Sequence, residues 1–146
     1  MNNARDFFSD EEKERIVESI RAAEAETSGE IRVHLSSGSC RSGVLNCAAH
    51  WFQKLKMHKT ELRNGVLFFI SIKDRQFAII GDAGINRKAP ENFWDDIKNQ
   101  ISVRFKEGLF ADGLSEGIRL AGDHLKTYFP RQKDDKNELS DDLSFS

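Results

Sequence analysis

The chain has 146 residues, a formal net charge of -2 from 22 basic and 24 acidic side chains, and 38% apolar residues. This size and composition predict one soluble domain that buries a hydrophobic core. The small net charge excludes a general electrostatic attraction to nucleic acid or to an anionic membrane surface.

The sequence shows no pattern typical of export or of a membrane span. No apolar segment follows a basic start, and the longest apolar run, residues 66–72, is far shorter than the roughly 20 residues that cross a bilayer. Cys40 and Cys47 are the only cysteines, and without export they are expected to be reduced thiols. We therefore expect a cytoplasmic protein with no membrane span and no nucleic-acid partner.

Hydrophobic periodicity predicts a helix, a strand and a second helix in the first part of the chain. Ser9 and Glu12 form the S-x-x-E pattern of a capping box, and the helix that starts there ends at residues 27–29. Residues 30–37 alternate between apolar and polar side chains, which predicts a strand. After a loop rich in Ser and Gly, the apolar residues of 44–57 have helical spacing.

The second part of the chain predicts a hairpin followed by two helices. Residues 66–72 form a nearly continuous apolar run, typical of a central strand that is covered on both faces. A short polar turn leads into residues 76–80, the expected antiparallel partner. Because a helix joins the first two strands, those strands are expected to be parallel. One further helix follows Pro90 and ends at Gly108, and the last runs from Asp112 to Tyr128.

The predicted order α-β-α-β-β-α-α indicates the α/β class, with a small mixed sheet packed between helices. Residues 1–130 are expected to form this domain. Residues 131–146 are mostly polar and charged, and they are expected to be a disordered tail.

Six segments, taken together and in order, resemble the TPM domain family. The segments are 27–33, 57–60, 63–67, 74–85, 93–94 and 105–108. The family is named for a thylakoid lumen phosphatase, a photosystem II repair protein and a nematode receptor modulator, and the chain looks like a stand-alone cytoplasmic member of bacterial type. The resemblance covers about residues 7–130. It implies a three-layer α/β/α sandwich of Rossmann-like appearance.

The resemblance also implies a link to divalent-metal or phosphate chemistry, because the lumenal plant member is described as an acid phosphatase. Exported members tend to read Gly-Tyr-Gly-Leu-Glu after the third strand, whereas this chain reads Gly-Asp-Ala-Gly-Ile at residues 81–85. One fold hosts many unrelated activities, so the activity has to be argued from the residues of this chain.

Topology predicts a candidate site at one end of the sheet, before the second strand and after its antiparallel partner. The candidate ligand-binding residues are Arg63, Asn64, Asp82 and Gly84, and the candidate metal ligands are Asp82, Glu30 and Asp112. An arginine can hold two phosphate oxygens, and carboxylates suit Ca²⁺ or Mg²⁺. Together they fit metal-assisted hydrolysis of a phosphoester.

The same residues have a structural interpretation that stays open. Asp82 is able to cap backbone N–H groups in a tight turn, and Asp112 suits the N-cap of the last helix. Glu30 and Arg63 would then form a structural ion pair.

Two functions are consistent with this sequence. The first is a binding or accessory module that recognises a protein partner or a small phosphate-containing ligand at the Arg63/Asp82 end of the sheet. The alternative is a metal-dependent acid phosphatase that uses a divalent cation. The lack of a recognisable nucleophile–base pair favours the module.

Overall fold

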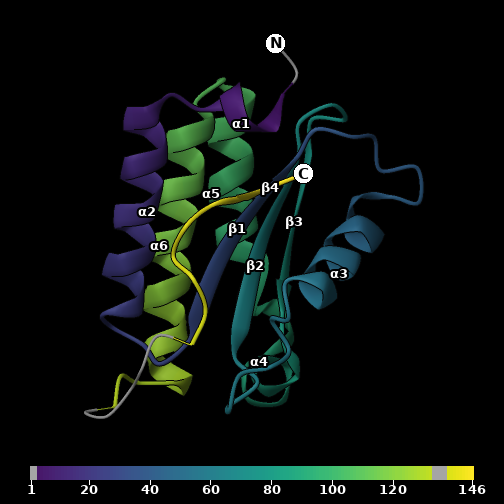
Figure 1. Ribbon diagram of the computed structural model, residues 1–146. Helices are drawn as coiled ribbons and strands as arrows, with labels where there is room; N and C mark the ends of the chain where they lie inside the picture. The colour runs from purple at the N-terminus through teal and green to yellow at the C-terminus, as the bar shows by residue number, and fades with distance from the viewer. Residues whose placement is uncertain (1–2, 133–137) are drawn as a thin grey trace.

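The computed structural model describes residues 3–132 and 138–146. In this part of the chain a sheet of four strands lies between two layers of helices (Figure 1). The strands are β1 (Glu30–Ser36), β2 (Gly65–Ser71), β3 (Gln76–Gly81) and β4 (Ser144–Phe145), in the spatial order β3-β2-β1-β4. The helices are α1 (Ala4–Phe7), α2 (Asp10–Glu24), α3 (Val44–Lys54), α4 (Ala83–Lys88), the 3-10 helix η1 (Glu91–Trp94), α5 (Asp95–Lys106) and α6 (Phe110–Tyr128).

The pairing of the central strands confirms the sequence prediction. β1 and β2 are parallel, with Glu30 opposite Gly65 and Ser36 opposite Ser71, because α3 carries the chain back between them. β2 and β3 are antiparallel and form the predicted hairpin. Every residue of β2 is buried, as expected for a strand that is covered on both faces.

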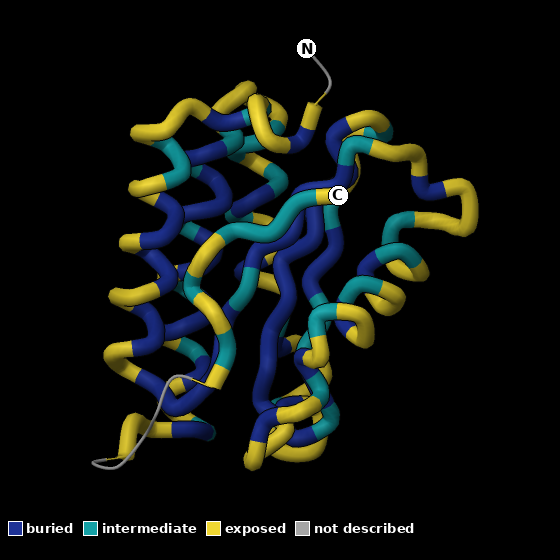
Figure 2. The backbone as a smooth tube through the Cα atoms, viewed as in Figure 1, coloured by how far each residue is buried: buried dark blue, intermediate teal, exposed yellow. Residues whose placement is uncertain are grey.

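Two apolar clusters hold the layers together. One lies between the sheet and the layer of α2, α5 and α6, and it includes Ile31, Val33 and Phe68. The other lies under α3 and includes Phe52 and Phe69. Figure 2 shows the buried backbone of the strands between the half-exposed helices. The expected α/β/α sandwich is therefore confirmed.

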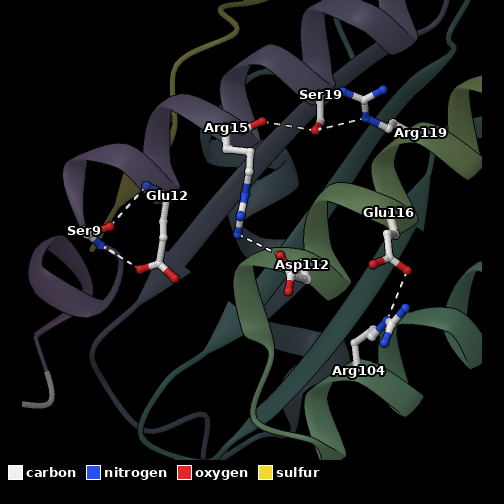
Figure 3. Close-up of polar contacts among 8 residues, drawn as sticks. All are labelled: Ser9, Glu12, Arg15, Ser19, Arg104, Asp112, Glu116 and Arg119. Carbon is white, nitrogen blue, oxygen red and sulfur yellow. Dashed lines mark hydrogen bonds and ion pairs between the residues drawn. The ribbon is translucent and has the colours of Figure 1, made fainter.

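The start of α2 is fixed by the predicted capping box (Figure 3). The Ser9 backbone N–H donates to Glu12 Oε1 at 2.9 Å, and the Glu12 backbone N–H donates to Ser9 Oγ at 3.1 Å. Both bonds satisfy N–H groups that a helix end leaves free. Within the described residues, no helix combines the length and the apolar character needed to cross a membrane.

The structure adds short elements that the periodicity did not predict. α1 and α4 have four and six residues, which is too short for a helical repeat to show in the sequence. The helix predicted after Pro90 is a 3-10 turn that continues into α5. The last helix begins at Phe110 rather than Asp112, with Leu109 as its N-cap.

The expectation of a disordered tail is wrong for residues 138–146, whereas residues 133–137 lie outside the described residues. β4 pairs in parallel with β1 and forms the edge of the sheet. Leu143 and Phe145 pack against the core beneath α2, and Leu139 packs on the α3 side. These apolar residues, spaced among the charges, give the segment enough surface to dock.

Candidate functional site

Arg63 and Asp82 are joined directly where the loop before β2 meets the start of α4. The Arg63 Nε donates to Asp82 Oδ2 at 2.7 Å, and Nη2 donates to Oδ1 at 2.9 Å. The Asp82 side chain is only 6% exposed, whereas that of Arg63 is 45% exposed. A buried carboxylate therefore holds a guanidinium at the surface, in the bidentate geometry that fixes both groups.

The backbone around this pair is equally constrained. Asp82 is the N-cap of α4, and its Oδ1 accepts from the Ala83 N–H at 2.8 Å, so its predicted capping role is confirmed. The Gly84 N–H donates to the Arg63 carbonyl at 2.8 Å. A Cβ at Gly84 would lie 2.2 Å from the Leu62 carbonyl oxygen and 2.6 Å from that of Arg63. The two loops cross in contact, and only glycine fits at the crossing.

Asn64 links the same loop to the start of β1. Its side-chain amide donates to the Ser28 carbonyl at 3.3 Å, and its own carbonyl accepts from the Glu30 N–H at 3.3 Å. Asn64 is 2% exposed. Its polar groups are therefore directed into the protein, and among the four residues predicted to bind a ligand, Arg63 is the one that reaches solvent.

The partner of Arg63 stabilises the protonated form of its guanidinium. The hydrogen bonds to Asp82 and the charge of its carboxylate raise the pKa of Arg63 above its ordinary value. Within the described residues, Arg63 Nη1 donates no hydrogen bond. Arg63 therefore presents a permanent cation with N–H groups left to donate.

Glu30 lies at the same end of the sheet, but it is not the partner of Arg63. Its Oε1 accepts from the Leu139 N–H at 2.8 Å. Burial, as the largest cause, raises its pKa to about 7. The predicted ion pair between Glu30 and Arg63 is therefore wrong. Glu30 binds the C-terminal segment, and Arg63 binds Asp82.

A second buried acidic side chain, that of Glu24, lies beside Glu30. Glu24, the last residue of α2, accepts from the Ile31 N–H with Oε2 at 2.8 Å. Burial, together with a hydrogen bond to Asp141, raises the pKa of Glu24 to about 9. The group is therefore a neutral carboxylic acid near pH 7, able to donate to the Asp141 carboxylate.

Asp112 is at the opposite end of the molecule, so the prediction that it joins the site is wrong. Figure 3 shows Asp112 turned toward Arg15, and their ion pair measures 2.8 Å. Phe110, at the start of α6, packs on Phe7 with ring centroids 5.4 Å apart. Since α6 begins there, Asp112 lies in its first turn and not at its N-cap.

The predicted metal ligands do not share a site. Asp82 is bound to Arg63, Glu30 to the Leu139 N–H, and Asp112 to Arg15. In residues 3–132 and 138–146, no group of three or more His, Cys, Asp and Glu side chains is arranged to hold a metal ion.

Sequence reasoning missed the buried acid Glu24 and the burial of His34, although both left a signal. Glu24 follows Ile20 by four residues and so falls on the buried face of α2. His34 is on the polar side of β1 and is fully buried. Because the neighbouring strand is apolar on both faces, the polar side of β1 also had to be covered.

Comparisons with known proteins give one family model and two similar solved structures. The model of the TPM domain matches residues 1–124. The chain is similar over 100% of both chains to the structure of BA42 protein from the psychrophilic bacterium Bizionia argentinensis, with 44% identity and a TM-score of 0.92. It shares the fold of the N-terminal domain of a protein from P. gingivalis, with 19% identity and a TM-score of 0.67 over 85% of this chain and 80% of that one. No curated protein matches.

The crossing at Gly84 predicts a large effect of one methyl group. Gly84→Ala should lower the free energy of unfolding by about 2 kcal/mol or more, because backbone atoms of the crossing loop would have to move. Gly38→Ala is the matched control, since a Cβ there meets nothing within 4 Å. Thermal or urea unfolding measures both. Equal stability of the two variants would show that the loops do not cross in contact.

The raised pKa of Glu24 predicts a stability that falls as pH rises. In the unfolded chain this carboxyl loses its proton near its ordinary pKa of 4.5, and in the folded protein near 9. The folded state therefore binds more protons between these values, and its advantage decreases with increasing pH. Glu24→Gln keeps an acceptor for Ile31 and a donor for Asp141 without ionising.

Glu24→Gln should therefore be close to the wild type near pH 5 and exceed its free energy of unfolding near pH 8, by at least about 1 kcal/mol and at most about 4 kcal/mol. Glu14→Gln, at an exposed position of the same helix, is the control and should follow the wild type at both pH values. Urea unfolding at the two pH values measures these free energies. The same change between pH 5 and pH 8 in all three proteins would contradict the neutral state of Glu24.

Proposed function

We propose that this chain, which belongs to the TPM domain family, is a binding module that recognises an acidic partner protein through Arg63 and performs no chemistry of its own. The observation that carries the proposal is the guanidinium of Arg63, held in place by a buried carboxylate and open to solvent on its outer side.

Preorganisation makes Arg63 suited to binding. A free arginine side chain loses about 2 kcal/mol of conformational entropy when a ligand fixes it. Here Asp82 and the loop crossing have already ordered the side chain. The remaining N–H groups are able to donate to a carboxylate or phosphate of a ligand.

The surroundings of Arg63 favour a protein partner. Leu62, the preceding residue, is 47% exposed, and Lys59 is exposed in the same loop. An arginine beside an exposed apolar side chain is typical of the residues that contribute most to protein interfaces. A free phosphate ion would bind the Arg63 guanidinium but would not cover the exposed Leu62 side chain.

The environments of Cys40, His34 and Asp82 support binding over catalysis. Burial, with a hydrogen bond to Cys47, raises the pKa of Cys40 to about 11, so this thiol is a poor nucleophile. Both ring nitrogens of the fully buried His34 contact serine hydroxyls. Both carboxylate oxygens of Asp82 accept hydrogen bonds from Arg63, and Oδ1 accepts another from the Ala83 N–H, which disfavours Asp82 as a general base.

Binding through Arg63 is tested with two anionic probes, inorganic phosphate and a short aspartate-rich peptide that carries a leucine. In a nuclear magnetic resonance titration, both should shift the amide signals of Leu62 and Gly84, and the peptide should bind more tightly. Arg63→Lys keeps the charge and loses the fork geometry, so affinity should fall about tenfold, which corresponds to about 1.4 kcal/mol.

Arg41→Lys, a change at an exposed arginine of another loop, is the matched control and should bind as the wild type does. Circular dichroism melts of all three proteins separate a loss of binding from a loss of folding. Equal affinity of folded Arg63→Lys and wild type would refute recognition through Arg63.

The phosphatase alternative is tested by hydrolysis of an aryl phosphate with Ca²⁺, Mg²⁺ and Mn²⁺, beside a thermal-shift titration with the same ions. The binding module predicts no turnover above the uncatalysed rate with any of the ions. Turnover that depends on a cation and disappears in folded Asp82→Asn would instead establish the metal-dependent phosphatase.

A further inference from the structure

The C-terminal residues lie along the outer edge of β1 as a short parallel strand. β4 pairs with His34 and Leu35. The Ser146 N–H donates to the Leu35 carbonyl at 3.0 Å, and the Ser37 N–H donates to the Ser146 carbonyl at 2.8 Å. β1 has seven residues, so this strand covers only part of the edge. A sheet edge is a general template for binding an extended chain.

His34 recognises the side chains at two positions of this strand. Its Nδ1 lies 2.7 Å from Ser144 Oγ and its Nε2 lies 2.9 Å from Ser146 Oγ. The ring is fully buried and stacks on Trp51 with centroids 4.1 Å apart. Burial lowers the pKa of His34 to about 4. A neutral imidazole has one donor and one acceptor nitrogen, which suits a hydroxyl on each side.

The residue between the two serines points to the other face and meets cations. Arg5 lies over the Phe145 ring at 5.2 Å and Lys13 at 5.4 Å. Both distances are within the range of cation–π attraction. The edge of β1 therefore selects a hydroxyl residue, an aromatic residue and a second hydroxyl residue in succession, alternating between its two faces.

Two acidic residues that precede Ser144 interact with arginines of the domain. Asp141 lies 3.8 Å from Arg21 Nε of α2, and the charge of Asp142 acts on Arg32 of β1. Acidic positions before the hydroxyl–aromatic–hydroxyl sequence thus face arginines that belong to the body of the domain.

There is room for a longer ligand at the end of the strand. An open surface hollow of about 550 Å³ lies beside Ser146 and is lined also by Asn3, Arg5, Ser37 and Phe145. A bound segment is therefore not required to end where this chain ends.

From these contacts we propose that the outer edge of β1 is a peptide-binding groove. Its ligand is an acidic, extended segment of a partner protein that carries a hydroxyl residue, an aromatic residue and a hydroxyl residue. This ligand takes the place that residues 138–146 hold in the structure, so the chain's own segment acts as a competitor. The groove is separate from Arg63 and does not depend on the function proposed for that residue.

The test uses a fluorescent peptide with the sequence of residues 138–146 and the full-length protein. The wild type should bind it weakly, because its own segment competes at an effective concentration on the order of millimolar. Phe145→Ala in the full-length protein removes the ring that Arg5 and Lys13 contact and weakens the competitor. The affinity for the peptide should then rise at least about tenfold in anisotropy titrations.

Changes in the peptide, rather than in the protein, test recognition without affecting folding. A peptide carrying Ser144→Ala and Ser146→Ala should bind the Phe145→Ala protein about tenfold more weakly, because each buried nitrogen of His34 would lose its partner. A shuffled peptide of the same composition controls for charge alone and should bind as weakly.

Three results would overturn the proposal. One is equal binding of the original and shuffled peptides, and another is equal affinity of wild type and Phe145→Ala for the original peptide. The third is a wild type that forms dimers in light scattering and loses them when the peptide is added, because the ligand would then be the segment of a second copy. If Phe145→Ala does not fold, titration of the wild type with excess of each peptide makes the same comparison.

Discussion

The structure depends on hydrogen-bond partners for the buried polar residues on one face of β1. Ile31, Val33 and Leu35 fill the core beneath α2 and α6, so the alternating positions are directed to the other side. There Glu30 and His34 are almost fully buried. A buried polar group without a partner costs about 1–3 kcal/mol. Burial of these groups therefore requires an extended segment along β1 that supplies those partners.

The C-terminal segment supplies these partners. The Leu139 N–H reaches Glu30, and the hydroxyls of Ser144 and Ser146 reach His34. The segment also closes an edge of the sheet, which would otherwise expose unpaired backbone groups. Its contacts are consequently directional hydrogen bonds at defined positions, and a different extended chain is able to supply them only if its hydroxyl residues fall at the same positions.

The two proposed binding surfaces are connected through the same segment. The Glu61 N–H, two residues before Arg63, donates to Glu138 Oε2 at 3.3 Å. A ligand that displaced residues 138–146 from β1 would remove this bond at the base of the Arg63 loop. The loop crossing at Gly84 and the ion pair with Asp82 would remain, so Arg63 keeps its position whether or not the segment is bound.

Sequence patterns predicted the elements whose signal is local and repeated. The alternation of β1, the apolar run of β2 and the capping box of α2 each follow from side chains within one turn or one strand. The candidate site was predicted from topology, which correctly brought Arg63, Asn64, Asp82 and Gly84 to one end of the sheet. Topology orders the elements but does not fix pairing, and so it gave Arg63 the wrong partner.

The errors have a common physical origin in long-range contacts. Asp112 was assigned to the site because it seemed to open a helix, but the helix begins at Phe110, which packs on Phe7 from the other end of the sequence. The tail was assigned to disorder from its charge, whereas its three apolar residues pack against the two apolar clusters and its two serines bind His34 of β1. Neither set of partners is visible in the segment itself.

The buried acids make the attachment of the segment sensitive to protons. Glu24 keeps its proton up to a pKa of about 9 and shares a hydrogen bond with Asp141, while Glu30, with a pKa of about 7, lies near Glu138 and Asp141. As pH rises through this range, first Glu30 and then Glu24 become anions beneath an acidic segment. Arg21 offsets part of the repulsion through Asp141, but it is half exposed and screened by water.

The hydroxyl contacts of His34 do not change in this range, because its pKa lies near 4. At Glu30 the added charge faces Glu138 and Asp141, but the anion also strengthens the bond that the Leu139 N–H donates to it, so the two effects oppose each other. At Glu24, loss of the proton removes the donor to Asp141 and adds repulsion, so this acid is the one whose ionisation weakens the attachment of the segment.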